Sequence, residues 1–126
     1  MTEPAEQGRP TLVIVLTSQG AANFNEIELE GILDFDSEGR MVGIEVLWLG
    51  RQMGIAPRFG DARSHGGSVS YPISSPAGPA HLSFDSEADA LYLKLADRAA
   101  PVQRHGDVVF AVDDLGLIHR IDIFVR

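Results

Sequence analysis

The sequence predicts a mainly β protein, folded as an antiparallel sandwich or half-barrel of about seven to eight strands. Three observations support this prediction. Apolar and polar residues alternate with a period of two over 25–36 and again over 41–49, as in strands with one buried face. Two Asp-x-x-Gly turns, at 36–39 and 113–116, each connect two strand-like segments. The length of 126 residues fits a single domain, which we place at 11–126.

The first half of this domain, 11–49, is expected to contain three strands. The β-branched run that begins at Leu12 is too short for a typical helix and predicts a strand buried on both faces. The turn at 36–39 reverses the chain, because Asp can bond back to the backbone and Gly can adopt positive φ. The predicted inward positions of the two hairpin strands are Ile27, Leu29, Leu33 and Phe35, followed by Val42, Ile44, Val46 and Trp48.

Residues 50–80 are rich in glycine and proline and are expected to form a loop insertion, with a short strand possible from Ser68. Such a long connection is either an ordered lid or site wall, or slack chain. The second half, 81–126, begins with a strand that leads to one short helix near 86–90, for which Asp85 and Asp89 are the expected caps. Three further strands are expected to follow, the last two of which form the second hairpin.

The composition limits the classes of partner. The chain has 18 acidic and 10 basic residues, so its net charge of −8 repels nucleic acid and anionic membranes. It has no cysteine, which suits the cytoplasm and excludes thiolate metal sites and disulfides. Its longest apolar runs are far shorter than the roughly 20 residues of a membrane helix. We expect residues 1–10 to be a flexible tail, and no cofactor.

The two hairpins indicate an internal repeat. At an offset of 77 residues, Asp36 aligns with Asp113 and Gly39 with Gly116, and the strands that follow them align as well. At the same offset Ile14 aligns with Leu91, so a preceding strand is a candidate third element of the repeat. Two related halves that cover each other's apolar faces are therefore expected, with coincidence between two ordinary hairpins as the alternative.

A specific motif lies in the second half: Phe84-Asp85, then Glu87-Ala-Asp-Ala-Leu-Tyr-Leu, Gly106-Asp-Val-Val, an Asp-x-x-Gly turn and Ile121-Asp-Ile. In these segments the chain resembles the bacterial family called domain of unknown function 2283. The resemblance implies a small antiparallel β fold and no established activity or catalytic residues. Some members look like neighbours of small toxin-like proteins, which implies an antitoxin or binding role. His119-Arg120 departs from the usual Val-Gly of the family.

Two acidic patterns have competing interpretations. The spacing of acids around Gly39 resembles that of a calcium-binding EF-hand loop, but both flanks alternate as strands and not as helices, so a solvated turn is favoured and no metal is expected. The row Glu26, Glu28 and Glu30 either receives a basic partner or protects a sheet edge. The calcium candidates by spacing are Asp34, Asp36, Glu38 and Glu45.

His119 is the strongest candidate for a catalytic or anchoring group. It aligns with Val42 on the inward side of its strand, where it is either a hydrogen-bonded core histidine or an acid–base group at the floor of a cavity. His81 and Tyr71 are catalytic candidates that approach it only if the 50–80 loop folds over. Arg58 and His65 are candidate ligand-binding residues in that loop.

Two functions remain open from the sequence. The first is a non-enzymatic binding or assembly module that meets a protein partner with a basic surface or forms a homo-oligomer through strand edges. The second is a small-molecule-binding protein or small enzyme, with a pocket floored by His119 and roofed by 50–80. The first is favoured, because no complete catalytic constellation can be assembled from the sequence.

Overall fold

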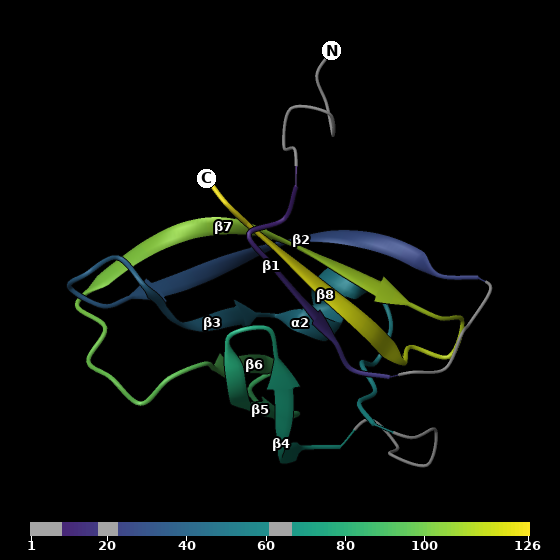
Figure 1. The fold of residues 1–126 in the computed structure, drawn as a ribbon. Coiled ribbons are helices and arrows are strands. Elements are labelled where there is room, and N and C mark those ends of the chain that lie inside the picture. Colours follow the sequence, from purple (N-terminus) through teal and green to yellow (C-terminus); the bar gives the residue numbers. More distant parts are fainter. Residues whose placement is uncertain (1–8, 18–22, 61–66) are drawn as a thin grey trace.

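The computed structural model describes residues 9–17, 23–60 and 67–126 and confirms a mainly β fold (Figure 1). Eight antiparallel strands form one sheet in the order β1-β8-β7-β2-β3-β6-β5-β4. The strands are β1 (Leu12–Val15), β2 (Asn25–Phe35), β3 (Met41–Leu47), β4 (Val69–Ser75), β5 (Gly78–Asp85), β6 (Ala90–Lys94), β7 (Val102–Val112) and β8 (Ile118–Val125), and one helix, α2, spans Leu49–Met53.

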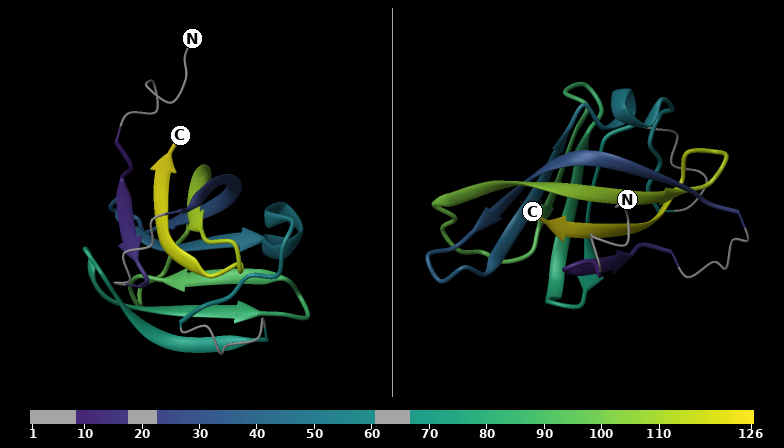
Figure 2. Two further views of the ribbon diagram at one scale, coloured as in Figure 1. Left: turned by 90° about the vertical axis from the view of Figure 1, so that its right-hand side faces the viewer. Right: turned by 90° about the horizontal axis from the view of Figure 1, so that it is seen from above.

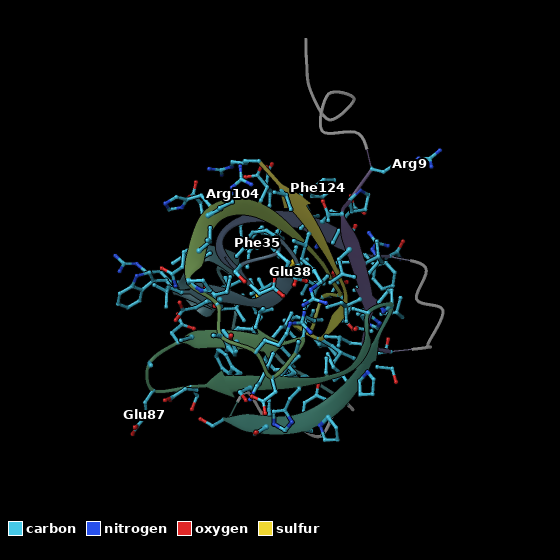
Figure 3. All side chains as sticks on the ribbon, turned by 60° about the vertical axis from the view of Figure 1, so that its left-hand side comes forward. Arg9, Phe35, Glu38, Glu87, Arg104 and Phe124 are labelled. Atoms are coloured by element: carbon cyan, nitrogen blue, oxygen red, sulfur yellow. The ribbon has the colours of Figure 1, made fainter. Side chains whose placement is uncertain are left out.

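The sheet curls until it is nearly closed. Figure 2 shows β4, β5 and β6 on one side and β2, β7 and β8 on the other, with the two outermost strands, β1 and β4, approaching each other. Side chains crowd the enclosed space (Figure 3). The inward positions of all the strands share one apolar core, whose most deeply buried members include Ile14, Leu33, Ile44, Leu82, Leu91, Leu93, Phe110, Ile121 and Ile123.

The two predicted hairpins have the same hydrogen bonds at positions 77 residues apart. In the first, Asp36 accepts bonds from the backbone N–H of Glu38 and Arg40. In the second, Asp113 accepts them from Leu115 and Leu117. Each pair of strands also has a register irregularity directly before its turn. The two turns are therefore built alike down to individual backbone contacts.

The central β2–β7 ladder relates the two halves by a local two-fold axis. Phe35 pairs with Val102 and Asn25 with Val112, and at the offset of 77 (112 − 35 = 102 − 25) each pair maps onto the other. The axis passes between the paired residues Glu30 and Asp107. The hairpin β2–β3 and the hairpin β7–β8 thus join through their first strands into one continuous sheet.

In the sheet, each hairpin is extended by a third strand, and that strand precedes the other hairpin in the sequence. β1 precedes the first hairpin and pairs with β8, whereas β6 precedes the second hairpin and pairs with β3. Ile14 lies opposite Ile121 and Leu93 lies opposite Ile44, so the structural counterpart of Ile14 is Leu93, at an offset of 79 (93 − 14). The predicted match with Leu91 is wrong by two residues, a slip that keeps the same face inward.

The helix predicted near 86–90 is a four-residue turn, because Asp85 and Ala90 already pair across the β5–β6 hairpin and leave only 86–89 to connect the strands. Asp85 caps this turn by accepting bonds from the N–H of Glu87 and Ala88. The helix lies instead at Leu49–Met53. Asp89 caps it from a distance: its carboxylate oxygens accept the N–H of Gly50 at 2.7 Å and of Arg51 at 3.1 Å.

The 50–80 insertion contains more regular structure than a loop. Most of α2 lies in its first residues, and the short strand expected from Ser68 is β4, which pairs along its full length with β5. Between them, Arg58 bridges to the β7–β8 turn: its N–H donates to Gly116 O at 2.9 Å, and its carbonyl accepts from Ile118 N at 3.0 Å. The flexible tail predicted at 1–10 falls mostly outside the described residues.

The equivalent glycines of the two turns give a matched test of this bridge. Both have positive φ, but a Cβ on Gly39 would meet nothing within 4 Å, whereas one on Gly116 would lie 2.5 Å from the Ala56 carbonyl oxygen. We expect Gly39→Ala to cost about 1 kcal/mol through its backbone conformation alone. Gly116→Ala should cost about 2–3 kcal/mol, because it also displaces the bridging segment. Urea unfolding of both variants measures the difference, and equal losses would contradict the role given to the bridge.

Candidate functional site

A partly buried chain of polar groups links Asp113, His119 and Thr17. His119 is 3% exposed on β8 and lies on the inward side, as predicted. Its Nε2 lies 3.0 Å from Asp113 Oδ2 and its Nδ1 lies 2.6 Å from Thr17 Oγ1. In the neutral imidazole the carboxylate, which only accepts, holds the proton on Nε2, so Nδ1 accepts the Thr17 hydroxyl proton. The ring of Phe24 packs against the imidazole at a centroid distance of 4.7 Å.

A carboxylate, an imidazole and a hydroxyl in this order are the groups that activate a nucleophile in hydrolases. In this protein their contacts favour a structural role. The carbonyl of His119 accepts the N–H of Leu16 at 2.8 Å, so the residues of the polar chain join the end of β1 to β8. Burial favours neutral Asp113, but hydrogen bonds from His119 and from the turn backbone outweigh it and hold the pKa of this carboxyl below its ordinary value.

The equivalent joint, between β3 and the end of β6, shows which residues stand at these positions when there is no polar chain. Val42 stands where His119 does, and Ala96 stands where Thr17 does. The carbonyl of Val42 accepts the N–H of Leu95 at 2.7 Å and of Ala96 at 3.2 Å, which is the same backbone arrangement. The backbone joint therefore forms with apolar side chains too, and of the two joints only the one between β1 and β8 has the polar chain.

The remaining histidine, tyrosine and arginine candidates do not surround one cavity with His119. His81 is exposed on β5, where its Nε2 lies 2.7 Å from Ser70 Oγ. Tyr71 packs toward the core from β4; burial raises the pKa of its phenol, and its hydroxyl has no hydrogen-bond partner within the described part of the chain. Arg58 contributes the backbone bridge to the β7–β8 turn. His65 lies outside the described residues.

The predicted calcium candidates lie on strands and a turn, and three of the four bind other protein groups. Asp34 accepts a bond from Gln103 Nε2 at 3.0 Å, and Glu38 forms an ion pair with Arg40 at 3.0 Å. Glu45 lies on the outer face of β3. Over residues 9–17, 23–60 and 67–126, no group of three or more histidine, cysteine or acidic side chains is arranged to hold a metal ion.

Asp36 is the most strongly bound of these acids. Its Oδ1 accepts the backbone N–H of Glu38 and Arg40 at 2.9 Å each, and its Oδ2 lies 2.9 Å from the Nε atoms of both Arg40 and Arg98. These bonds, led by the backbone N–H of Arg40, lower its pKa from 3.8 to about 2 against the opposing effect of burial. Asp36 therefore ties the first turn to the segment before β7.

The acidic row on β2 does not protect an edge, because β2 lies in the middle of the sheet between β7 and β3. Two of its members have partners from the same face. Glu26 binds Arg120 at 2.6 Å, and Glu30 binds Arg126 at 3.1 Å. Arg126 also binds Asp107, and the two carboxylates raise the pKa of its guanidinium. The chain therefore supplies its own arginines to part of this acidic face.

Trp48 does not point inward as predicted. β3 ends at Leu47, and Trp48 adopts a left-handed conformation with φ 59° and ψ 43°, so that its side chain is 56% exposed and Leu49 is buried in its place. This conformation costs a bulky residue about 1–2 kcal/mol. It persists because Asp89 binds the start of α2, as described above. The guanidinium of Arg51 lies 5.7 Å from the centre of the indole ring.

A hollow on the outer face is lined in part by Leu47, the residue before Trp48. We call it the outer-face hollow; its volume is about 140 Å³, and it is lined by Glu30, Gly31, Ile32, Glu45, Leu47 and His105. Leu47 is 40% exposed, so the hollow has an apolar wall and two carboxylates. The sequence analysis missed this site, since the alternation over 41–49 placed Trp48 in the core and gave no sign that β3 stops at Leu47.

A second hollow of about 260 Å³ lies on the other side of Glu30, lined by Glu28, Leu29, Gln52, Asp107 and Arg126 as well as Glu30 itself. The side-chain amide of Gln52 closes the gap between β2 and the end of β3: it accepts the N–H of Glu30 at 3.1 Å and donates to Leu47 O at 2.7 Å. It thereby takes the place of a backbone pair between Leu47 and Glu30, and Glu30 lines both hollows.

No protein-family model, curated protein or solved structure matches this chain. Among the described helices, none has the length and apolar character needed to cross a membrane.

The polar chain can be tested by giving the β1–β8 joint the apolar residues of the β3–β6 joint. His119→Val should cost about 1–3 kcal/mol of unfolding free energy, because it leaves the Thr17 hydroxyl and the Asp113 carboxylate without their partner. Thr17→Ala with His119→Val reproduces the Val42–Ala96 pair and should cost less than the sum of the single variants by about 0.5–3 kcal/mol. Chemical denaturation of all three variants gives these values. Strict additivity would show that the Thr17–His119 bond contributes nothing.

The low pKa of Asp36 predicts an acid-sensitive contribution to stability. Because its pKa is lower in the folded protein than the ordinary 3.8, this contribution is complete above about pH 4 and is lost as the pH falls toward about 2. Asp36→Asn should therefore flatten the dependence of unfolding free energy on pH in this window. Asp97→Asn removes the same charge from a side chain that is 97% exposed and controls for the change in net charge. Parallel slopes for both variants would refute the assignment.

Proposed function

We propose that this protein is a non-enzymatic binding module that docks a partner protein on its outer face, around Trp48 and Leu47. The observation that carries the proposal is Trp48 itself. A large aromatic side chain is held exposed in a strained backbone conformation, fixed by Asp89 from a distant turn. Strain of this kind concentrates at functional sites. Tryptophan is also enriched among the residues that dominate binding energy at protein interfaces.

The interior supports a binding role over catalysis. The space enclosed by the sheet is occupied by large apolar side chains such as Phe110 and Leu82. His119, which the enzyme hypothesis placed at the floor of a pocket, has partners at both ring nitrogens and is covered by Phe24. The outer-face hollow is smaller than the roughly 300 Å³ at which small-molecule pockets begin, but it suits a single side chain of a partner.

The charge of the protein selects the partner's chemistry. With a net charge of −8 and two carboxylates in the outer-face hollow, the protein favours a basic protein surface over nucleic acid or an anionic membrane. A cytoplasmic location agrees with the absence of cysteine, and the resemblance to domain of unknown function 2283 fits an antitoxin-like binding role. Self-association through strand edges is less favoured, because the edge strand β4 contains Pro72, which has no backbone N–H, and β1 has only four residues.

The proposal predicts that a bound partner depends on Trp48. The baits in extract from the source cells are the wild-type protein, Trp48→Ala and Leu115→Ala. Leu115 is the control, because it is an apolar residue that is 61% exposed on the β7–β8 turn. A protein retained by the wild type and by Leu115→Ala should bind Trp48→Ala at least tenfold more weakly, about 1.4 kcal/mol. The complex is then rebuilt from purified proteins and its affinity is measured by titration calorimetry, because Trp48→Ala lacks the only tryptophan and has no emission to report binding.

Two results would contradict the proposal. One is a rebuilt complex whose affinity is the same for the wild type and Trp48→Ala. The other is a loss of affinity of equal size in Trp48→Ala and Leu115→Ala, which would place the interface away from the outer face.

A further inference from the structure

The carboxylate of Glu45 is unusual among the acids of the outer face. It is half-buried on β3 and lines the outer-face hollow, and within the described residues it has neither a hydrogen bond nor an ion pair. Its charge is close enough to Tyr92 to contribute to the raised pKa of that phenol, after the larger effects of burial and of Asp34. A partly buried anion without a cation loses solvation and gains nothing in exchange.

The second half shows what an acid at this position normally has. The counterpart of Glu45 is Asp122, whose Oδ1 lies 3.0 Å from Arg120 Nε. The counterpart of Arg120 in the first half is Gly43. A Cβ on Gly43 would lie 2.2 Å from the Tyr92 hydroxyl, so Tyr92 occupies the space that a side chain there would need. The first half therefore keeps the acid but has lost the place for an internal cation.

The shape of the outer-face hollow fits the missing cation. Its volume of about 140 Å³ is that of one long side chain, and Leu47 and Ile32 give it apolar walls. Lysine and arginine bury their methylene stems along such walls while their charged ends reach a carboxylate. Glu30 and Glu45 both line the hollow. His105, which has no hydrogen bond or ion pair within the described part of the chain, adds a ring that a planar guanidinium can stack on.

The protein's own Arg126 provides a precedent on the same face. It lines the second hollow, on the other side of Glu30, and its guanidinium binds Glu30 and Asp107 together. The same acidic face thus accepts an arginine on one side of Glu30. On the other side, Glu45 has the charge for a second one and no arginine of the described chain reaches it.

We propose that the outer-face hollow is a socket for a cationic side chain of the partner, an arginine or lysine whose charge pairs with Glu45 and whose stem packs on Leu47. This inference rests on the proposed function and adds the chemistry that the partner must present. Trp48 follows Leu47 directly, about 3.8 Å away along the backbone, so an inserted side chain brings its neighbours in the partner onto the exposed indole.

The test uses three peptides of equal length and the fluorescence of Trp48, titrated at about 0.15 M salt so that distant charges are screened. The peptides are octa-arginine, octalysine and octa-citrulline, which has the shape of arginine without its charge. We expect the cationic peptides to bind and octa-citrulline not to. Glu45→Gln should weaken their binding by about tenfold, as expected for loss of a charge-assisted bond.

Glu87→Gln is the matched control. It removes the same charge from the 86–89 turn, where the side chain points away from the body of the protein (Figure 3), and it should weaken binding by less than about twofold. Equal weakening by Glu45→Gln and Glu87→Gln would overturn the socket, since only the net charge would then matter. Equal binding of octa-citrulline would overturn it as well, because the site would not recognise charge.

Failure of the socket and failure of the proposed function are distinguishable. If the rebuilt partner complex depends on Trp48 but not on Glu45, docking stands and the socket is wrong. If sedimentation shows that the wild type self-associates and that Glu45→Gln alone makes it monomeric, the occupant is a second copy of this chain, which overturns the assignment to a separate partner. If the complex does not depend on Trp48, the proposed function itself fails.

Discussion

The antiparallel pairing of β2 with β7 is the constraint on which the rest of the structure depends. The ladder runs over all eleven residues of both strands, from Asn25 opposite Val112 to Phe35 opposite Val102. At its centre Gly31 faces Gly106, and a Cβ on either would meet Val108 or Leu33 at under 3 Å. Because the two facing glycines have no side chains, the side chains of neighbouring residues can lie over the ladder at this point. The sheet can therefore curl tightly about its middle. Every other strand takes its position from this pair.

The local two-fold symmetry also separates what the fold requires from what is particular to each half. Matching turns, inward apolar positions and the backbone joint at the end of each hairpin occur twice. Departures occur at a few positions, where His119 replaces an apolar residue and where Gly43 replaces the arginine that neutralises the acid beside it. The symmetric counterpart shows the same backbone without the feature. An unpaired Glu45 thereby becomes informative, because Asp122 shows the same site with its cation present.

Much of the fold was predictable because its signals are local. Alternation with a period of two and the chemistry of the Asp-x-x-Gly turns depend on neighbouring residues, and both hairpins and the inward position of His119 followed from them. Contacts between distant segments were not predictable. The helix at Leu49–Met53 depends on Asp89, which lies 39 positions beyond Gly50. The carboxylate of Asp89 also explains why Trp48 is exposed. The central place of β2, the two-residue slip of β1 and the outer-face hollow likewise arise from pairings that no local pattern encodes.

The exchange of leading strands has a consequence for how the chain is made. Leu12 pairs with Ile123, so β1 has no strand to join until nearly the whole domain has been synthesised. On the ribosome, the first hairpin emerges with both flanks open, because β3 pairs with β6 and β2 with β7, and β1 waits longer still for β8. Sheets built from such distant pairings form slowly and expose unpaired edges meanwhile. Because β1 has only four residues, the edge that it exposes in the nascent protein is short, which limits pairing with a neighbouring chain.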